Sequence, residues 1–307
     1  MRAAVLGLVG LATLVACARR PHGAQRLGPS DWDAEVSSDG RVRRYLLHVP
    51  AAVQRGGPAP LVLVLHGGGG SPEQMRDATG MNDEADRRGV IVAYPQGLAG
   101  LFDDNATWNA GQCCGYPHGK RVDDVAFIRR LIADVAGRWS VDSTRIYATG
   151  FSDGGRMVYR LACELSRTFA AVAPVSGAIP DTTCRPERSV SIVAIHGTAD
   201  SVLRYYGGPD PDLPAGATTL DTRAAIAHWA LLDGCRAPPR LDSIGPVVIS
   251  RYASCDSSDL ALYTILDRGH QWVRQLSATR AAGDAVVWTS SVVLDFLLRH
   301  SRLPAQR

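Results

Sequence analysis

The segment with the strongest chemical signal is Gly150-Phe151-Ser152-Asp153-Gly154-Gly155. It follows the strand-like run Arg145–Thr149 and precedes a helical pattern. A serine on a tight turn between strand and helix projects its hydroxyl from the carboxyl edge of the sheet, as in a nucleophile elbow. Gly150 and Gly154 lie two residues to either side and allow such a turn to close. We therefore predict that Ser152 is a nucleophile.

A second glycine-rich segment, His66 to Gly70, follows the buried strand pattern Leu61–Leu65. Acyl transfer develops negative charge on the former carbonyl oxygen, and fixed backbone N–H donors stabilise it. We predict that the amides of Gly68 and Asp153 form this oxyanion hole. A phosphate-binding loop is the alternative, but no Gly-Lys-Ser/Thr sequence follows.

A serine nucleophile needs a histidine base and an orienting carboxylate, in the chain order Ser, acid, His. The strand pattern Val190–Ile195 leads to Asp200, and Leu260–Ile265 leads to His270. Both residues are therefore expected at the carboxyl ends of core strands, where catalytic groups gather in α/β sheets. We predict that His270 is the general base and that Asp200 orients it.

Several other residues compete for these roles. His66 precedes the serine and is better placed to brace the oxyanion loop, whereas His196 precedes Asp200 and is expected to be buried beside it. Asp267 lies only three residues before His270, which makes contact with the distal ring nitrogen awkward. The remaining candidates are expected to be solvated or packed: His118, His228 and His300.

Alternating strand and helix patterns must position these residues. Strand-like runs are expected at 44–49, 61–65, 90–94, 145–149, 170–175, 190–195 and 260–265. Helices are expected at 73–88, 122–138, 154–165, 220–232 and 286–299, with Asp123 or Asp124 capping the second. This alternation favours an α/β-hydrolase fold, with a mostly parallel central sheet and helices on both faces.

Composition fits a packed globular enzyme. Apolar residues make up 46% and charged residues 21%, and the formal net charge is only +3. Basic residues are almost all arginines, because Lys120 is the only lysine. No clustered basic face interleaved with aromatics is evident, so a nucleic-acid partner is not expected.

The N-terminus resembles an export signal. Met1-Arg2 precedes an apolar run that ends at Ala16, and Leu14-Val15-Ala16-Cys17 resembles the cleavage box of bacterial lipoproteins. We expect a signal peptide at residues 1–16 and lipidation of Cys17, so that only the lipid contacts the membrane of the bacterial cell envelope. A conventional signal peptide and a secreted protein are the alternative. Residues 17–40 are expected to be a flexible tether, and 41–303 a single catalytic domain.

Six cysteines remain after Cys17, an even number that suits disulfides in an oxidising compartment. Cys235 and Cys255 flank one compact segment and make a reasonable local pair. Cys113 and Cys114 are adjacent, so at least one of them is expected to bond elsewhere. The cysteines lack the CxxC repeats of a zinc site, so a structural metal is the minor alternative to disulfides, and no cofactor is expected.

These segments resemble the polyhydroxybutyrate depolymerase and feruloyl esterase family of α/β-hydrolases, in particular its LpqC-type bacterial lipoproteins. The resemblance runs from about residue 41 to about residue 298 and implies the same triad, Ser152, Asp200 and His270. It rests on the blocks Leu65 to Gly69, Trp108-Asn109, Cys113-Cys114, Val122 to Ile128, Gly150 to Gly155, Tyr159 to Glu164, His196 to Asp200 and Gly269 to Trp272.

The resemblance implies a serine carboxylic-ester hydrolase that acts on feruloyl, acetyl or hydroxyalkanoate-type esters, free or linked to polysaccharide or polyester. Asp153 stands where the family usually has asparagine, and Gln271, Ser201 and Arg204 also depart from its pattern. An envelope acyltransferase with the same triad and a non-catalytic binding lipoprotein are the alternatives. Substrate-pocket residues are expected at Trp108, Asn109, Tyr205 and Trp272.

Overall fold

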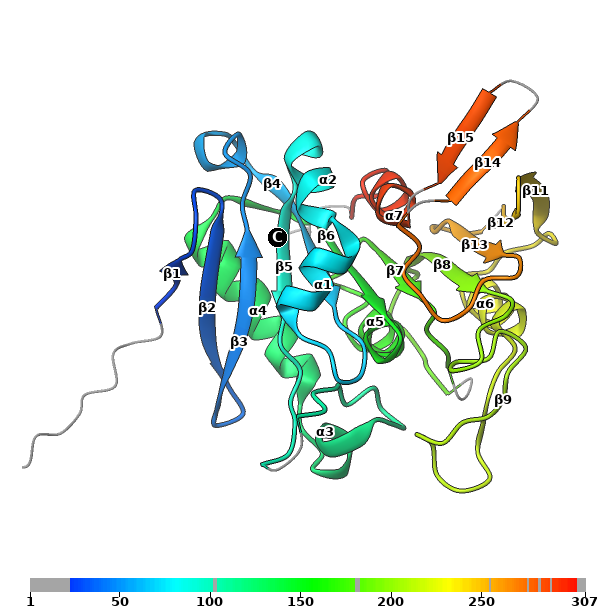
Figure 1. Cartoon of the computed structure of the whole chain (residues 1–307), viewed down its shortest axis with the longest axis horizontal. Coiled ribbons are helices and arrows are strands. Elements are labelled where there is room, and N and C mark those ends of the chain that lie inside the picture. The colour runs from blue at the N-terminus through cyan, green and yellow to red at the C-terminus, as the bar shows by residue number, and fades with distance from the viewer. Residues whose placement is uncertain are drawn as a thin grey trace, which may run out of the picture.

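The computed structural model describes residues 23–101, 104–179, 183–253, 255–274, 276–280, 283–287 and 289–302. The predicted signal peptide and Cys17 lie outside these described residues. A twisted sheet crosses the molecule, with helices on both of its faces (Figure 1). The strands are β1 (Gln25–Arg26), β2 (Asp31–Ser38), β3 (Arg41–His48), β4 (Ala59–Leu65), β5 (Ile91–Pro95), β6 (Val141–Phe151), β7 (Ala171–Val175), β8 (Ser191–Gly197), β9 (Gly208–Pro209), β10 (Thr218–Thr219), β11 (Arg240–Ile244), β12 (Val247–Tyr252), β13 (Leu260–Ile265), β14 (Leu276–Arg280) and β15 (Gly283–Val287). The helices are η1 (Val53–Arg55), α1 (Pro72–Thr79), α2 (Met81–Arg88), α3 (Gly115–Gly119), α4 (Asp124–Arg138), α5 (Asp153–Glu164), α6 (Thr222–Leu232) and α7 (Thr289–Leu297).

The main sheet has the order β1-β2-β3-β5-β4-β6-β7-β8-β13-β12-β11. Its central strands, from β5 to β13, are parallel, and both edges are antiparallel. This confirms the predicted α/β fold with a mostly parallel central sheet. Leu65 pairs with Gly150, and Gly197 pairs with Ile265, so the strand ends that carry the predicted site meet at one edge.

Each central strand is buried on both faces, as parallel strands usually are. In β4, Leu61, Leu63 and Leu65 belong to the core under α4, α5 and α6, whereas Val62 and Val64 belong to the core under α1, α2 and α7. The continuous apolar run in the sequence reflects this two-sided burial. Within the described part of the chain, no helix is long and apolar enough to cross a bilayer.

The folded region begins earlier than expected. Residues 31–38, predicted to lie within a tether, form β2 and pair along their whole length with β3. Ala34 is buried, and Trp32 and Val36 pack against the same core. The tether prediction is therefore wrong for this part, because apolar residues at every second position form a half-buried strand despite the charged residues between them.

The predicted helix at residues 73–88 is two helices. Gly80 separates them and adopts φ +59°, the left-handed conformation with which helices commonly end. The predicted cap of α4 is present, because the Asp123 side chain accepts the N–H of Ala126 at 2.8 Å. The segment predicted as one helix at 286–299 contains the end of β15, and α7 begins only at Thr289.

The six cysteines form three disulfides. Cys235 bonds Cys255, as expected, and Cys163 bonds Cys184. Cys113 bonds its neighbour Cys114, so the expectation that one of these two bonds elsewhere is wrong. The two cysteines are buried together against Leu213.

Candidate active site

The turn after β6 has the geometry of a nucleophile elbow. The backbone of Ser152 adopts φ 57° and ψ −121°, a conformation that is rare for residues other than glycine. Helix α5 begins at the next residue. A Cβ on Gly150 would lie 2.5 Å from the carbonyl oxygen of Gly154. A Cβ on Gly154 would lie 2.4 Å from the carbonyl oxygen of Leu65. The close approach of these backbones therefore requires glycine at both positions.

His270 lies between Ser152 and Asp200. Its Nε2 is 2.9 Å from Ser152 Oγ, and its Nδ1 is 2.8 Å from Asp200 Oδ2. Because the carboxylate can only accept, Nδ1 carries the hydrogen and Nε2 is left to accept the proton of the serine hydroxyl. The Phe151 ring packs against the imidazole, with 4.7 Å between ring centroids. The structure thus brings the three predicted residues into one hydrogen-bonded chain.

The Asp200 side chain is fully buried and held on both oxygens. Oδ1 accepts the N–H groups of Val202 and Leu203 at 3.0 and 2.9 Å. Oδ2 faces His270 and also His196 Nε2, at 3.2 Å. Burial alone would raise the pKa of Asp200, but hydrogen bonds from His196 and His270 hold it well below its usual range. The ionised carboxylate therefore stabilises the folded state above the ordinary carboxyl pKa of about 4, and this contribution is lost as the pH falls towards the folded-state value.

The alternative candidates for the general base and the orienting acid, His196 and Asp267, make other contacts. His196 is buried beside Asp200, as expected, and its Nε2 donates to the carbonyl oxygen of Leu203 at 2.7 Å. Asp267 is exposed, and its backbone N–H donates to Thr198 Oγ1 at 2.9 Å. The carboxylate that His270 contacts is therefore Asp200 and not Asp267, although Asp267 is nearer in sequence.

Buried contacts hold the glycine loop after β4, His66 to Gly70, in place. Trp108 Nε1 donates to the carbonyl oxygen of His66 at 2.8 Å, and the N–H of Gly69 donates to Ala106 at 2.9 Å. The Trp108 and His66 rings also pack together, with 4.9 Å between centroids. These buried contacts fix the loop that carries the predicted oxyanion donor.

His66 itself acts as a neutral brace, the role expected for it. Its Nδ1 donates to the carbonyl oxygen of Gly67 at 2.7 Å, and its Nε2 accepts the N–H of Gly97 at 2.9 Å. Burial lowers the pKa of His66 to about 4, so the ring is uncharged at neutral pH. In the described part of the chain, the amides of Gly68 and Asp153 donate to no protein acceptor, which leaves both available to a substrate oxygen.

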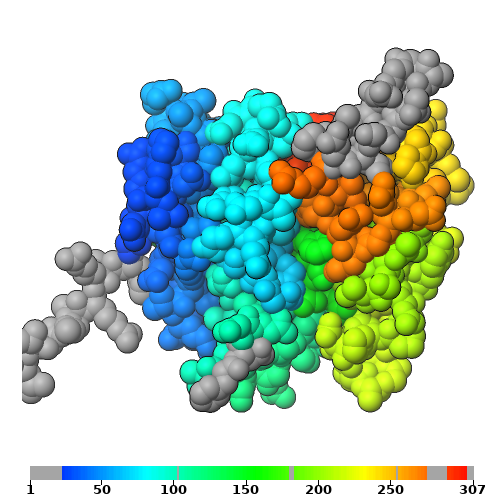
Figure 2. Space-filling model, viewed as in Figure 1, coloured from blue at the N-terminus to red at the C-terminus, as the bar shows by residue number. Residues whose placement is uncertain are grey.

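A cleft of about 510 Å³ opens beside Ser152 and His270. On the face shown in Figure 2, the cyan segment of α1 lies beside the orange segment that carries His270. Sequence reasoning missed half of the lining, because most of these residues lie outside the recognised motifs and on different elements. The missed residues are Gln74, Met75, Ala78, Asn105, Phe151, Val202, Leu203 and Asp212.

The four residues predicted to line the pocket lie elsewhere. Trp108 and Tyr205 are buried, and the Tyr205 hydroxyl bonds Thr264 Oγ1 at 2.7 Å. The other two are also buried: Asn109 Nδ2 donates to the Val122 carbonyl at 2.9 Å, and Trp272 Nε1 donates to Ser290 Oγ at 3.1 Å. The prediction is wrong because their polar atoms are committed to internal bonds that hold loops in place.

Comparison with known proteins agrees with this geometry. Residues 43–204 match the model of a family described as esterase PHB depolymerase. The chain is 33% identical over 290 residues to a protein of Nocardia uniformis subsp. tsuyamanensis that is named as an esterase, NocK. The match covers 86% of this chain and 81% of that protein. It is 30% identical over 235 residues to feruloyl esterase B of Piromyces equi, covering 74% of this chain and 42% of that protein.

Among solved structures, the acetyl xylan esterase from Aspergillus awamori has a similar fold. The TM-score is 0.55 at 17% sequence identity, covering 75% of this chain and 89% of that one. A thermostable esterase gives the same TM-score and identity, covering 89% of this chain and 64% of that one.

Proposed function

Because this chain belongs to the esterase PHB depolymerase family and is a carboxylic ester hydrolase, we propose that it cleaves its substrates through an ester formed on Ser152. The observation that carries the proposal is the chain of contacts from Ser152 Oγ through His270 to Asp200, at 2.9 and 2.8 Å. A hydroxyl paired with a base that a carboxylate orients is the arrangement that activates serine for acyl transfer.

In the first half-reaction, His270 Nε2 takes the hydroxyl proton while Ser152 Oγ attacks the ester carbonyl carbon. The amides of Gly68 and Asp153 stabilise the resulting oxyanion. When the carbon–oxygen bond to the alcohol breaks, His270 returns the proton to the departing oxygen. Water, deprotonated by His270, then attacks the acyl-serine and releases the carboxylic acid and the free serine.

Short or aromatic acyl groups, such as acetyl, feruloyl or hydroxyalkanoate, fit the site best. The cleft of about 510 Å³ is lined by the glycine loop, by polar side chains and by apolar side chains such as Met75, Phe151 and Val202. The names of the similar proteins, feruloyl esterase B and acetyl xylan esterase, support the same substrate range.

A substrate panel tests this proposal. For the full chain, kcat/KM is expected to be at least about tenfold higher for p-nitrophenyl acetate than for p-nitrophenyl palmitate, because the glycines that form much of the lining give a long acyl chain little side-chain surface to contact. Methyl ferulate is expected to release ferulic acid. Equal or faster cleavage of the palmitate would contradict the proposed acyl preference. The same assay with added sugar acceptors distinguishes hydrolysis from acyl transfer, since transfer that outcompetes release of acid would favour an acyltransferase.

A further inference from the structure

Two carboxylates line the cleft beside the nucleophile. Asp153 directly follows Ser152, and Asp212 comes from the loop between β9 and β10. Carboxylate oxygens of the two residues lie within 4.8 Å of each other. The Asp153 side chain is only 11% exposed, whereas the Asp212 side chain is 48% exposed. The pair therefore spans the cleft from its buried part to its solvent-facing side.

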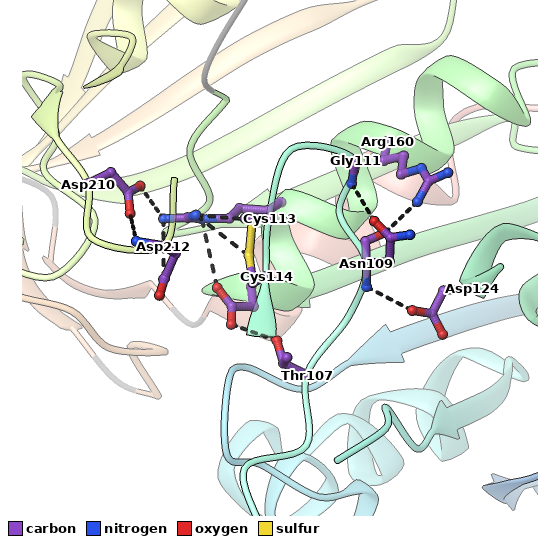
Figure 3. Close-up of a disulfide and its surroundings, with 11 residues drawn as sticks. Thr107, Asn109, Gly111, Cys113, Cys114, Asp124, Arg160, Asp210 and Asp212 are labelled. Carbon is purple, nitrogen blue, oxygen red and sulfur yellow. Dashed lines mark hydrogen bonds and ion pairs between the residues drawn. A yellow bond between two sulfur atoms is a disulfide. The ribbon is translucent and has the colours of Figure 1, made fainter. Parts of the chain in front are cut away.

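The same arginine forms ion pairs with these two carboxylates and with a third. The buried Arg156 guanidinium bonds Asp210 directly and lies 3.8 Å from Asp153 and 3.9 Å from Asp212. Figure 3 shows Asp210 and Asp212 close together beside the Cys113–Cys114 disulfide. Three carboxylates against one guanidinium leave an excess of negative charge. Among the described residues that line the cleft, none is an arginine or a lysine.

Only one oxygen of Asp153 accepts a hydrogen bond from the described residues. Its Oδ2 accepts a hydrogen bond from Thr107 Oγ1 at 2.7 Å. Its Oδ1 has no hydrogen-bond partner among the described residues, and the Arg156 contact at 3.8 Å is too long for one. The carboxylate also lies against the glycine loop, because a Cβ on Gly68 would be 2.7 Å from Asp153 Oδ2. A negative charge at this position opposes the charge that develops on the substrate oxygen.

We infer that the cleft selects esters carrying a cationic ammonium group, which the Asp153–Asp212 pair binds beside Ser152. This inference rests on the proposed esterase function. A bound cation would satisfy Asp153 Oδ1 and offset the field that the carboxylates impose on the oxyanion. Burial and the neighbouring charge of Asp153 raise the pKa of Asp212, which is the response of a carboxyl group that lacks a sufficient counter-ion.

Other ligands fit these residues less well. A metal ion would need further donors, and the nearby Cys114 sulfur is bonded to Cys113 and is therefore not a thiolate ligand. A sugar ring usually stacks on an aromatic face, but Phe151, the aromatic carbocycle in the described lining, packs against His270. An organic cation needs only the negative charge that the pair provides.

Isosteric ester pairs that differ only in charge test the inference with the full chain. On the leaving-group side, acetylthiocholine is compared with S-(3,3-dimethylbutyl) thioacetate. On the acyl side, p-nitrophenyl 4-(trimethylammonio)butanoate is compared with p-nitrophenyl 5,5-dimethylhexanoate. Each kcat/KM is divided by the alkaline hydrolysis rate of the same ester, which removes the intrinsic effect of the charge on reactivity. At low salt, the cationic ester of at least one pair is expected to be favoured by about tenfold or more.

The variant Asp212→Asn keeps the shape of the side chain and removes its charge, so the preference ratio is expected to fall towards one. Asp242→Asn, an exposed position on β11, is the matched control and is expected to keep the ratio. As a second measurement, choline is expected to inhibit cleavage of the neutral ester competitively, with a higher inhibition constant in Asp212→Asn.

A ratio near one in both pairs, or an unchanged ratio in Asp212→Asn, would overturn the inference. If the neutral esters are then still cleaved and Ser152→Ala does not cleave them, the proposed esterase function stands and only the cation preference fails. If the wild-type chain cleaves none of the esters, the proposed function fails and the inference fails with it.

Discussion

Ser152→Ala lowers kcat/KM for p-nitrophenyl acetate by roughly 10⁴- to 10⁶-fold, the range expected when the nucleophile of a serine hydrolase is removed. The alanine leaves the cleft, the glycine loop and His270 in place, but it provides no oxygen that can form the acyl ester. KM changes less than kcat, because the hydroxyl acts mainly in the transition state rather than in substrate binding.

Ser143→Ala is the matched control for this variant, since residue 143 lies on the same strand, β6, and is exposed near the opposite end. It is expected to keep wild-type activity within about twofold, as surface substitutions usually do. Loss of less than tenfold in Ser152→Ala, with the variant folded by circular dichroism, would contradict the assignment of the nucleophile.

Asp200→Asn lowers kcat by about 10³- to 10⁴-fold, since an amide can hold His270 in the tautomer that no longer accepts the serine proton. The buried site also loses the charge that stabilises the imidazolium formed during attack. The same carboxylate oxygen also contacts His196, so the substitution alters that contact as well.

Asp267→Asn is the matched control for Asp200→Asn, because Asp267 is the acid nearest to His270 in sequence. Residue 267 is exposed on the turn after β13, and the variant is expected to change kcat by no more than about twofold. A large loss in Asp267→Asn together with a small loss in Asp200→Asn would reverse the assignment of the orienting acid.

The sequence predicted that Ser152, Asp200 and His270 lie together, because each of these residues follows a strand of the parallel sheet. The apolar runs located those strands, and the carboxyl ends of parallel strands meet at one edge. Ser152, Asp200 and His270 could therefore be placed together although the last two lie far from the serine in sequence. The glycines of the elbow added a second signal that is independent of the strands.

The lining of the cleft could not be predicted in the same way. Trp108 and Trp272 belong to motifs shared with the family, but their ring nitrogens bond His66 and Ser290 inside the protein. Motif membership did not distinguish residues that position loops from residues that contact a ligand. Asp212 lies in a loop rich in proline and glycine, and only the fold brings it to Asp153.

Local sequence patterns also gave wrong predictions where a strand or helix boundary lies in a polar segment. In β2, charged residues alternate with Trp32, Ala34 and Val36, and the segment was taken for a tether because its composition is polar. One face of the strand packs on the core and the other is solvated, which explains this alternating composition. The single helical pattern at 73–88 likewise concealed the break at Gly80.

Identification of the acylated residue tests the central claim most directly. The full chain is mixed with excess p-nitrophenyl acetate, quenched in acid within the first turnover and digested for peptide mass spectrometry. An acetyl group on Ser152, absent after the ester is exhausted, is the predicted result. Turnover with no acetyl group on Ser152, or with an acetyl group that forms on another residue and disappears at the rate of turnover, would contradict catalysis by this serine.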